Sequence, residues 1–139
     1  MIIAGVEEAG RGPVIGPMVM AIVTIEEKDE FKLDILGVRD SKQLTPKKRE
    51  ELFDVIKETA NDFKIFIIGA PKIDSAVESV ESNLNWLEAD TTVELIESVD
   101  AKKVILDCPS NNLTEYKNYI LKRLKDAEFN SLRSTQNYK

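Results

Sequence analysis

Two adjacent carboxylates, Glu7 and Glu8, follow an apolar run at residues 1–6 and stand just before a Gly-Arg-Gly-Pro turn at residues 10–13. Carboxylate oxygens are the ligands that hard cations such as magnesium prefer. Glycines let the backbone approach a phosphate where side chains would block it. These residue types indicate metal and phosphate chemistry, but an acidic strand end followed by a Gly-Pro loop accounts for them equally well without any function.

A third carboxylate, Asp107, closes the run Lys102 to Asp107, whose central residues are apolar on both faces, as in a buried parallel strand. If this strand lies beside the first one, Asp107 could reach the same site. Neighbouring residues of a strand point to opposite faces, so Glu7 and Glu8 converge on one site only if the strand ends or bends there. Taken alone, Asp107 is more often a turn residue.

Residues 40–45 offer a second set of groups that suit a phosphate. Lys42 carries an ammonium group, and Ser41 and the free amides near Thr45 can donate hydrogen bonds. As an isolated segment, these residues more often form a solvated entry to a helix. The sequence context therefore has to decide between the two interpretations.

The amino-acid composition limits the locations and the kinds of chemistry that are open to this chain. The chain has 139 residues with 42% hydrophobic and 32% charged residues, which is typical of one globular domain. No apolar run reaches the roughly 20 residues of a membrane span, and no secretory signal begins the chain, so we expect a cytoplasmic location and no membrane association. A single cysteine excludes an intramolecular disulfide, and the absence of histidine excludes histidine general bases. The net charge of −6 disfavours non-specific polyanion binding by the chain as a whole.

Hydrophobic periodicity predicts an α/β fold in which a mixed sheet is covered by helices. Thr45 and Pro46 form a favourable helix start, since threonine caps free amides and proline suits the first helical position. The predicted strands cover residues 1–6, 15–25, 63–68 and 102–107, and the predicted helices cover residues 31–36, 46–60, 84–99 and 113–124.

The first motif as a whole resembles that of ribonuclease HII, the type 2 ribonuclease H, particularly in its archaeal form. That family reads Gly-(Ile/Val)-Asp-Glu-Ala-Gly-Arg-Gly-Pro, and this chain differs only at Glu7, where the family has aspartate. Residues 40–45, Asp-Ser-Lys-Gln-Leu-Thr, resemble the second motif, and residues 106–109 resemble the strand that ends in aspartate. The resemblance covers about the first 125 residues.

The resemblance implies a ribonuclease H-like mixed sheet with flanking helices. It also implies hydrolysis of RNA in RNA/DNA hybrids, or at ribonucleotides embedded in duplex DNA, by a monomer that uses two Mg²⁺ or Mn²⁺ ions. The residues that it assigns to metal binding and catalysis are Glu7, Glu8 and Asp107. The residues that it assigns to substrate binding are Gly10, Arg11, Gly12, Ser41 and Lys42.

Two departures from the family lead us to expect impaired activity. Glu7 is one methylene longer than aspartate, and the chain stops at Lys139, before the family's C-terminal elements and final acidic ligand. We therefore expect an incomplete catalytic domain at residues 1–126, a tail of unclear origin at residues 127–139, and an uncovered sheet edge or helix-packing face. The alternatives are a non-catalytic module that binds hybrids or phosphates, and an unrelated acidic α/β protein.

Overall fold

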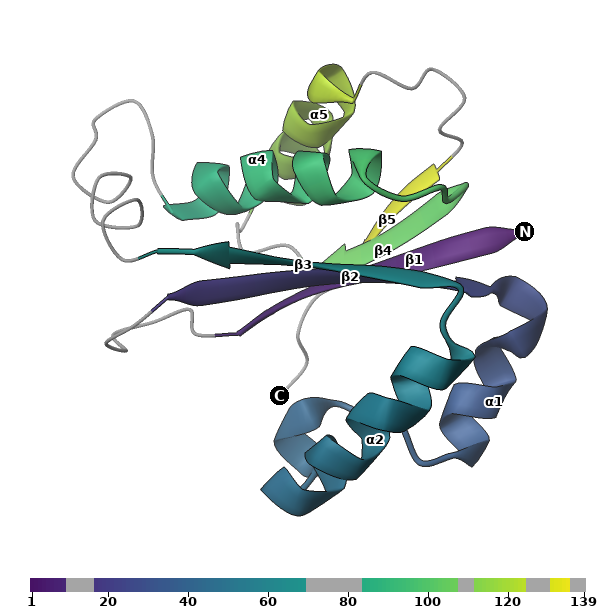
Figure 1. Cartoon of the computed structure of the whole chain (residues 1–139). Coiled ribbons are helices and arrows are strands. Elements are labelled where there is room, and N and C mark those ends of the chain that lie inside the picture. The colour runs from purple at the N-terminus through teal and green to yellow at the C-terminus, as the bar shows by residue number, and fades with distance from the viewer. Residues whose placement is uncertain (10–16, 70–83, 108–111, 125–130, 136–139) are drawn as a thin grey trace.

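A five-stranded mixed sheet forms the centre of the molecule (Figure 1). The computed structural model describes residues 1–9, 17–69, 84–107, 112–124 and 131–135. The strands are β1 (Ile2–Ala9), β2 (Met18–Glu26), β3 (Asp62–Ile68), β4 (Lys103–Asp107) and β5 (Ser131–Thr135). Their order is β3-β2-β1-β4-β5, with β2 antiparallel to both β1 and β3, and β4 parallel to both β1 and β5. The parallel arrangement expected of the fourth strand is confirmed.

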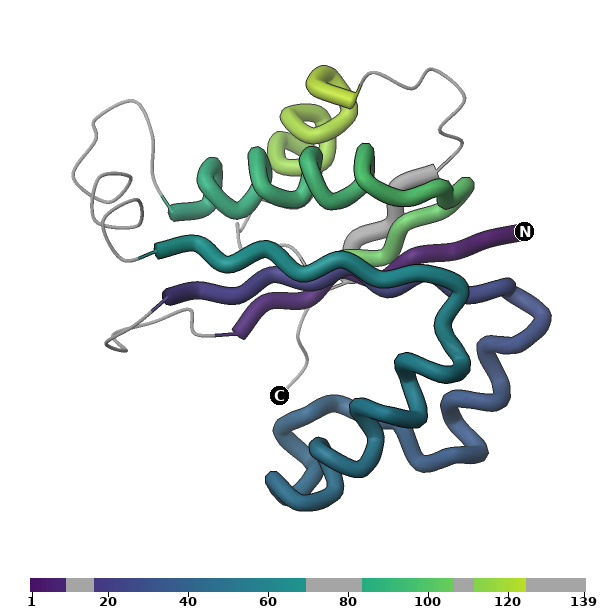
Figure 2. The backbone as a smooth tube through the Cα atoms, viewed as in Figure 1, coloured from purple at the N-terminus to yellow at the C-terminus, as the bar shows by residue number. Residues whose placement is uncertain are grey.

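Helices lie on both sides of this sheet. On one side are α4 (Leu84–Glu97) and α5 (Leu113–Arg123), and on the other are α1 (Glu30–Ile35) and α2 (Pro46–Thr59) (Figure 1). Two short 3-10 helices, η1 (Glu27–Asp29) and η2 (Ser41–Gln43), precede α1 and α2. The tube in Figure 2 follows the chain from β2 down through α1 and α2 and back up to β3. Among the described residues, no helix has the length and apolar character to cross a membrane.

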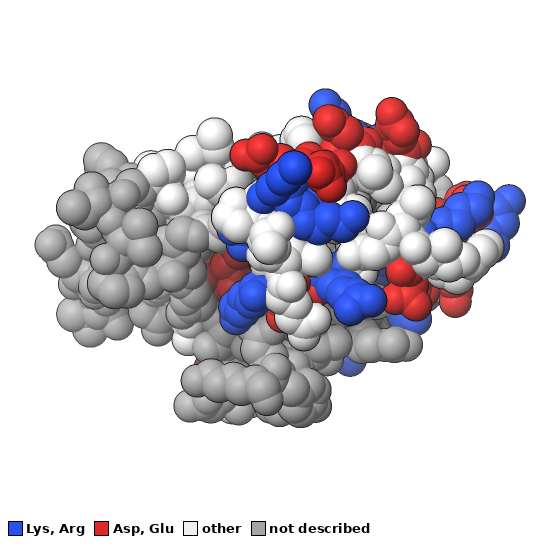
Figure 3. Space-filling model, turned by 90° about the horizontal axis from the view of Figure 1, so that it is seen from below, with Lys and Arg blue, Asp and Glu red and all other residues white. Residues whose placement is uncertain are grey.

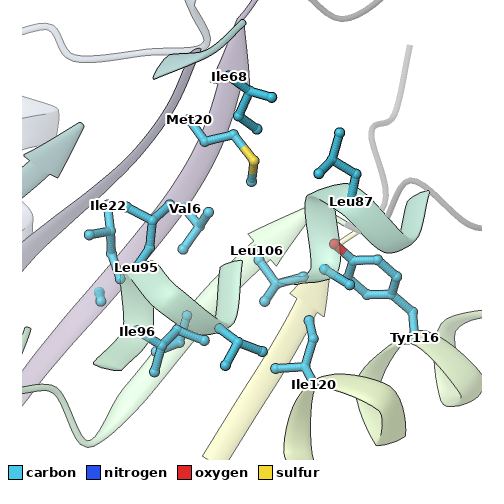
Figure 4. Close-up of a cluster of buried hydrophobic side chains, with 14 of the residues drawn as sticks. Val6, Met20, Ile22, Ile68, Leu87, Leu95, Ile96, Leu106, Tyr116 and Ile120 are labelled. Atoms are coloured by element: carbon cyan, nitrogen blue, oxygen red, sulfur yellow. The ribbon is translucent and has the colours of Figure 1, made fainter. Parts of the chain in front are cut away.

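The main core lies between the sheet and the α4–α5 layer (Figure 4). Ile22 of β2, Leu95 of α4 and Ile120 of α5 are completely buried there. Thr91 is also buried, and its hydroxyl donates a hydrogen bond to the Leu87 carbonyl at 2.9 Å, so no polar group is left without a partner at that position. This core holds β1 and β4, the two strands that carry the candidate site.

The helix starts follow local rules. The Thr45 hydroxyl accepts a hydrogen bond from the Lys48 amide at 3.1 Å, and Pro46 opens α2, as the sequence predicted. Asn112 caps α5 in the same way, accepting from the Glu115 amide at 3.0 Å. Gly37, the residue after the C-cap of α1, has a φ of +90°, a conformation that glycine adopts without strain.

The last strand differs from our expectation, since the sequence predicted no regular element beyond Asp126. Residues 131–135 form β5, and its register with β4 runs from Lys103 beside Ser131 to Asp107 beside Thr135. The segment Ser131–Thr135 has one large apolar residue, too few for a periodicity signal. Its strand conformation depends on pairing with β4. The proposed boundary between domain and tail at residue 126 remains a prediction.

Candidate functional site

The carboxyl ends of β1 and β4 bring two of the predicted site residues to the same edge of the sheet. Val6 and Leu106 are partners in the parallel β1–β4 register, and Glu7 and Asp107 are the next residues of the two strands. Parallel neighbours are separated by roughly 4.8 Å in the hydrogen-bonding direction, so the two backbone positions are level and close. The condition set by the sequence, that the fourth strand lies beside the first, is confirmed.

Glu7 and Glu8 both lie within β1, where they pair with Ala21 and Met20 of β2. The side chain of Glu7 is exposed, and that of Glu8 is half-buried. The Glu8 amide donates a hydrogen bond to Oε1 of Glu7 at 3.0 Å. A carboxylate has about four acceptor sites, so this bond leaves Glu7 able to accept further hydrogen bonds or to bind a metal ion. Strand alternation turns the two side chains to opposite faces, and their convergence on one ion remains a prediction.

The donor chemistry of this edge suits a hard cation. The candidate ligands Glu7, Glu8 and Asp107 offer only carboxylate oxygens, which favour Mg²⁺ or Mn²⁺ over softer metals. The described side chains include no group of three or more acidic, cysteine or histidine residues that could hold a metal ion. The side chain of Asp107 lies outside the described part, as do Gly10, Arg11 and Gly12, so their roles stay predictions.

The second predicted segment forms a compact turn at the start of α2. Oδ1 of Asp40 accepts a hydrogen bond from the Lys42 amide at 3.0 Å, and Nη1 of Arg49 donates to the Ser41 carbonyl at 3.1 Å. The first bond caps η2, and the second ties η2 to the first turn of α2. The side chains of Ser41 and Lys42 are exposed and available to a ligand in solution.

A concentration of positive charge surrounds this turn and was not singled out by the sequence analysis. Residues 39–49 carry one acidic residue, Asp40, and five exposed basic residues, which are Arg39, Lys42, Lys47, Lys48 and Arg49. The first turn of α2 has no acidic residue, although the positive end of a helix dipole favours one. Basic groups are visible on this side of the molecule (Figure 3). A count of charge over residues 39–49 would have identified this basic segment.

Trp86 of α4 packs between α4 and α5. Its ring stacks on Tyr119 with centroids 4.5 Å apart, and the Arg123 guanidinium lies 3.4 Å from the centroid of the Tyr119 ring. The Tyr119 hydroxyl donates a hydrogen bond to Oδ1 of Asp90 at 2.7 Å. Desolvation by burial raises the pKa of Tyr119, and the hydrogen bond to Asp90 and the negative charge of Asp90 raise it further. Arg123 has the opposite effect on this pKa. These contacts give Trp86 a packing role.

Comparisons of the chain with known proteins agree on one family. The family model described as Ribonuclease HII matches residues 4–131 of the chain. The ribonuclease HII of Methanococcus maripaludis strain C6 is 41% identical over 145 residues, and the match includes 99% of this chain. The ribonuclease HII of Thermococcus onnurineus is 46% identical over 102 residues, or 73% of this chain and 43% of the relative.

Solved structures agree with the sequence matches. The crystal structure of ribonuclease H2 from Pyrococcus horikoshii OT3 superposes on the whole chain with a TM-score of 0.83 and 34% identity. The match covers 63% of that chain, and the chain likewise spans 59% of the length of the Methanococcus maripaludis relative. The described fold is therefore that of a large part of these longer proteins.

Proposed function

Because the chain belongs to the ribonuclease HII family, we propose that it binds RNA/DNA hybrids, or duplex DNA with embedded ribonucleotides, and hydrolyses the RNA strand with divalent metal. The observation that carries this proposal is the level placement of Glu7 and Asp107 at the carboxyl ends of the adjacent parallel strands β1 and β4. Such an edge brings backbone positions from separate parts of the chain close together. The activity of this chain, which spans 59% of the relative's length, is part of the proposal.

In this proposal Glu7, Glu8 and Asp107 would hold the metal ions. When bound, Mg²⁺ or Mn²⁺ would supply Lewis acidity that activates a water molecule and stabilises the leaving 3′-oxygen. Hydrolysis adds water across the bond between phosphorus and that oxygen and yields 5′-phosphate and 3′-hydroxyl ends. The carboxylates would offset the positive charge of the bound ions.

We assign the substrate contacts to the glycine-rich segment at residues 10–13 and to the basic segment at residues 39–49. Gly10, Arg11 and Gly12 are assigned to the ribonucleotide, because exposed backbone amides and a guanidinium can contact its 2′-hydroxyl and the neighbouring phosphate. Ser41 and Lys42 are assigned to a phosphate of the duplex, and their side chains are exposed in support of this. The chain as a whole has a net charge of −6, which repels nucleic acid. The other basic residues of the segment 39–49 offset this repulsion locally.

A second candidate function is binding of the hybrid without cleavage. It is favoured by the extra methylene of Glu7, which displaces the carboxylate by roughly 1 Å, a misplacement that can reduce a rate about a hundredfold. Lys42 and the rest of the basic segment do not depend on the length of that side chain and would keep their affinity for phosphates. The two functions therefore share a binding surface and differ in turnover.

One experiment separates them. A labelled DNA duplex with a single embedded ribonucleotide is incubated with the chain in Mg²⁺ or Mn²⁺, and an all-DNA duplex of the same sequence serves as the control. Cleavage next to the ribonucleotide, with no cleavage of the control, supports the enzyme. Binding of the duplex without cleavage under both metals supports the binding module. If the chain neither binds nor cleaves, both proposals are wrong.

A further inference from the structure

The strand β3 forms one edge of the sheet, so only one of its two sides pairs with another described strand. The strand order is β3-β2-β1-β4-β5, and β2 is the neighbour of β3 within it. An edge strand presents a row of backbone N–H and C=O groups with which a further strand can pair, and proteins often prevent this with a proline, a bulge or a very short strand. β3 is seven residues long, contains no proline, and pairs with β2 in an unbroken register. None of these three features therefore blocks its edge.

A cavity of about 330 Å³ lies along this edge of β3, below α4 (Figure 1). It is lined by the five consecutive residues 65–69 and by Thr91 and Glu94 of α4. Side chains alternate between the two faces of a strand, so one face alone would contribute only every second residue. Five residues in a row indicate that the backbone edge itself lines the cavity. The cavity is therefore a groove between the edge of β3 and α4.

A lysine of β3 lies on the same side of the sheet as this groove. Lys64 pairs with Ile22 and Phe66 pairs with Met20, and both of these β2 residues belong to the main core. Directly opposite residues of an antiparallel pair have their side chains on the same face. Lys64 and Phe66 therefore lie on the α4 side of the sheet, where Glu94 stands.

Lys64 and Glu94 do not satisfy each other within one copy of the chain. Both are exposed, and in the described part of the chain neither takes part in an ion pair. A lysine on an edge strand normally acts against pairing, because its charge comes to lie beside the incoming strand. This obstacle is removed when the incoming chain places a carboxylate beside the lysine, since opposite charges on neighbouring strands stabilise a sheet.

We propose that two copies of the chain associate by antiparallel pairing of their β3 strands around a two-fold axis at Ile65. Ile65 is the midpoint of Asp62–Ile68, so this register uses the whole strand. It places Lys64 of one copy directly beside the partner's Phe66, at the groove that the partner's Glu94 lines. The two-fold axis repeats the contact, because a residue that meets another across such an interface is met by it in return. The interface therefore contains two pairs of Lys64 with Glu94.

A second copy suits this edge because the strand complements itself. In the proposed register Ile65 lies beside the partner's Ile65, and Phe63 lies beside the partner's Ile67. Ile67 is 70% exposed and Ile65 is 46% exposed, so pairing removes apolar surface from water. The net charge of −6 on each copy opposes association, but charges more than about 8 Å apart are largely screened at physiological salt. The pairing uses no residue assigned to metal or substrate, so it is independent of the proposed function, and it departs from the monomer that the family resemblance implies.

The reciprocity of the two charge pairs provides the test. Lys64→Glu places two carboxylates at each junction, and Glu94→Lys places two ammonium groups there. Both residues are exposed, so neither substitution disturbs a buried position. In an equimolar mixture of the two variants, a dimer that contains one copy of each has opposite charges at both junctions. Lys117→Glu, at an exposed position on α5, changes the net charge by the same amount as Lys64→Glu and is the matched control.

Sedimentation equilibrium at micromolar concentrations measures the association. We expect a reversible dimer of the unmodified chain, with a dissociation constant at least tenfold weaker for each single variant alone. The mixture of the two variants should return to within about threefold of the original value, and Lys117→Glu should change it less than twofold. Hydrogen exchange of the β3 amides should slow as the protein concentration rises, which reports the pairing edge directly.

Three outcomes would overturn the proposal. A chain that stays monomeric at these concentrations does not pair through β3. A dimer that Lys117→Glu weakens as much as Lys64→Glu does responds to net charge and not to this contact. A mixture that associates no more tightly than either variant alone shows that Lys64 does not meet Glu94 across the interface.

Discussion

Glu7 and Asp107 stand level on adjacent parallel strands, each one residue beyond the register partners Val6 and Leu106. They are one hundred positions apart in the sequence, and the placement of β4 beside β1 alone brings them together. Two acidic residues from separate strands therefore occupy neighbouring backbone positions at one edge of the sheet.

Restoring aspartate at position 7 should increase metal-dependent cleavage. Glu7→Asp shortens the side chain by one methylene, and correcting a displacement of roughly 1 Å is worth up to about a hundredfold in rate. The measurement is the initial rate of cleavage of the single-ribonucleotide duplex in Mn²⁺. Glu7→Gln is the control, since it keeps the length and removes the charge, and it should lower the rate. A detectable activity that Glu7→Asp left unchanged would contradict the assignment of Glu7 as a ligand.

Mn²⁺ should raise the melting temperature of the chain through the same carboxylates. At a free concentration about a hundredfold above the dissociation constant, binding adds about 2.7 kcal/mol to the free energy of unfolding, or several degrees. Asp107→Asn should lose most of this increase, because it removes one negative ligand. Glu94→Gln, at an exposed position on α4, should retain it. An equal increase in both variants would place the ion elsewhere.

Lys42→Ala should weaken binding of the hybrid and make it less sensitive to salt. Loss of one phosphate contact reduces the steepness of the plot of log affinity against log salt concentration by about 1. The affinity should fall by about the same factor for every nucleic-acid sequence. The comparison is with Lys117→Ala, an exposed lysine on α5 across the sheet. Binding curves measured at several salt concentrations give the two slopes. Identical slopes for the two variants would exclude Lys42 from the interface.

Local patterns in the sequence were sufficient for most of the fold. The Thr45-Pro46 pair predicted the start of α2, and the apolar run before Asp107 predicted a buried parallel strand. β1 continues to Ala9, three residues past its predicted end, because Glu7 and Glu8 pair with β2. Polar residues at a strand end interrupt an apolar pattern, whereas backbone hydrogen bonding to a neighbour does not depend on side-chain polarity.

Long-range pairing accounts for what the sequence left open. The strand conformation of Ser131–Thr135 depends on β4 and leaves almost no periodic signal of its own. The proximity of Glu7 and Asp107 could be stated only as a condition, since it requires the order of strands in the sheet. The basic segment at residues 39–49 is different, because a count of local charge reveals it without any structure.

The contact between Tyr119 and Asp90 should make stability depend on pH in the alkaline range. Burial, helped by the bond to Asp90, raises the pKa of Tyr119 above its ordinary value of 10.0, despite the opposing effect of Arg123. Above about pH 10 the unfolded chain therefore loses this proton before the folded chain does, and the folded state loses stability as pH rises through the raised pKa.

Tyr119→Phe removes the titrating group and tests this prediction. Below about pH 9 the substitution should lower the free energy of unfolding by no more than about 1 kcal/mol, since the hydrogen bond that it removes is exposed. Between about pH 9 and about pH 11 the wild type should lose stability faster than the variant. Urea unfolding of both proteins across this range measures the difference, and lysine titration cancels because both contain the same lysines. Two curves that run parallel would show that Tyr119 titrates alike in the folded and unfolded states.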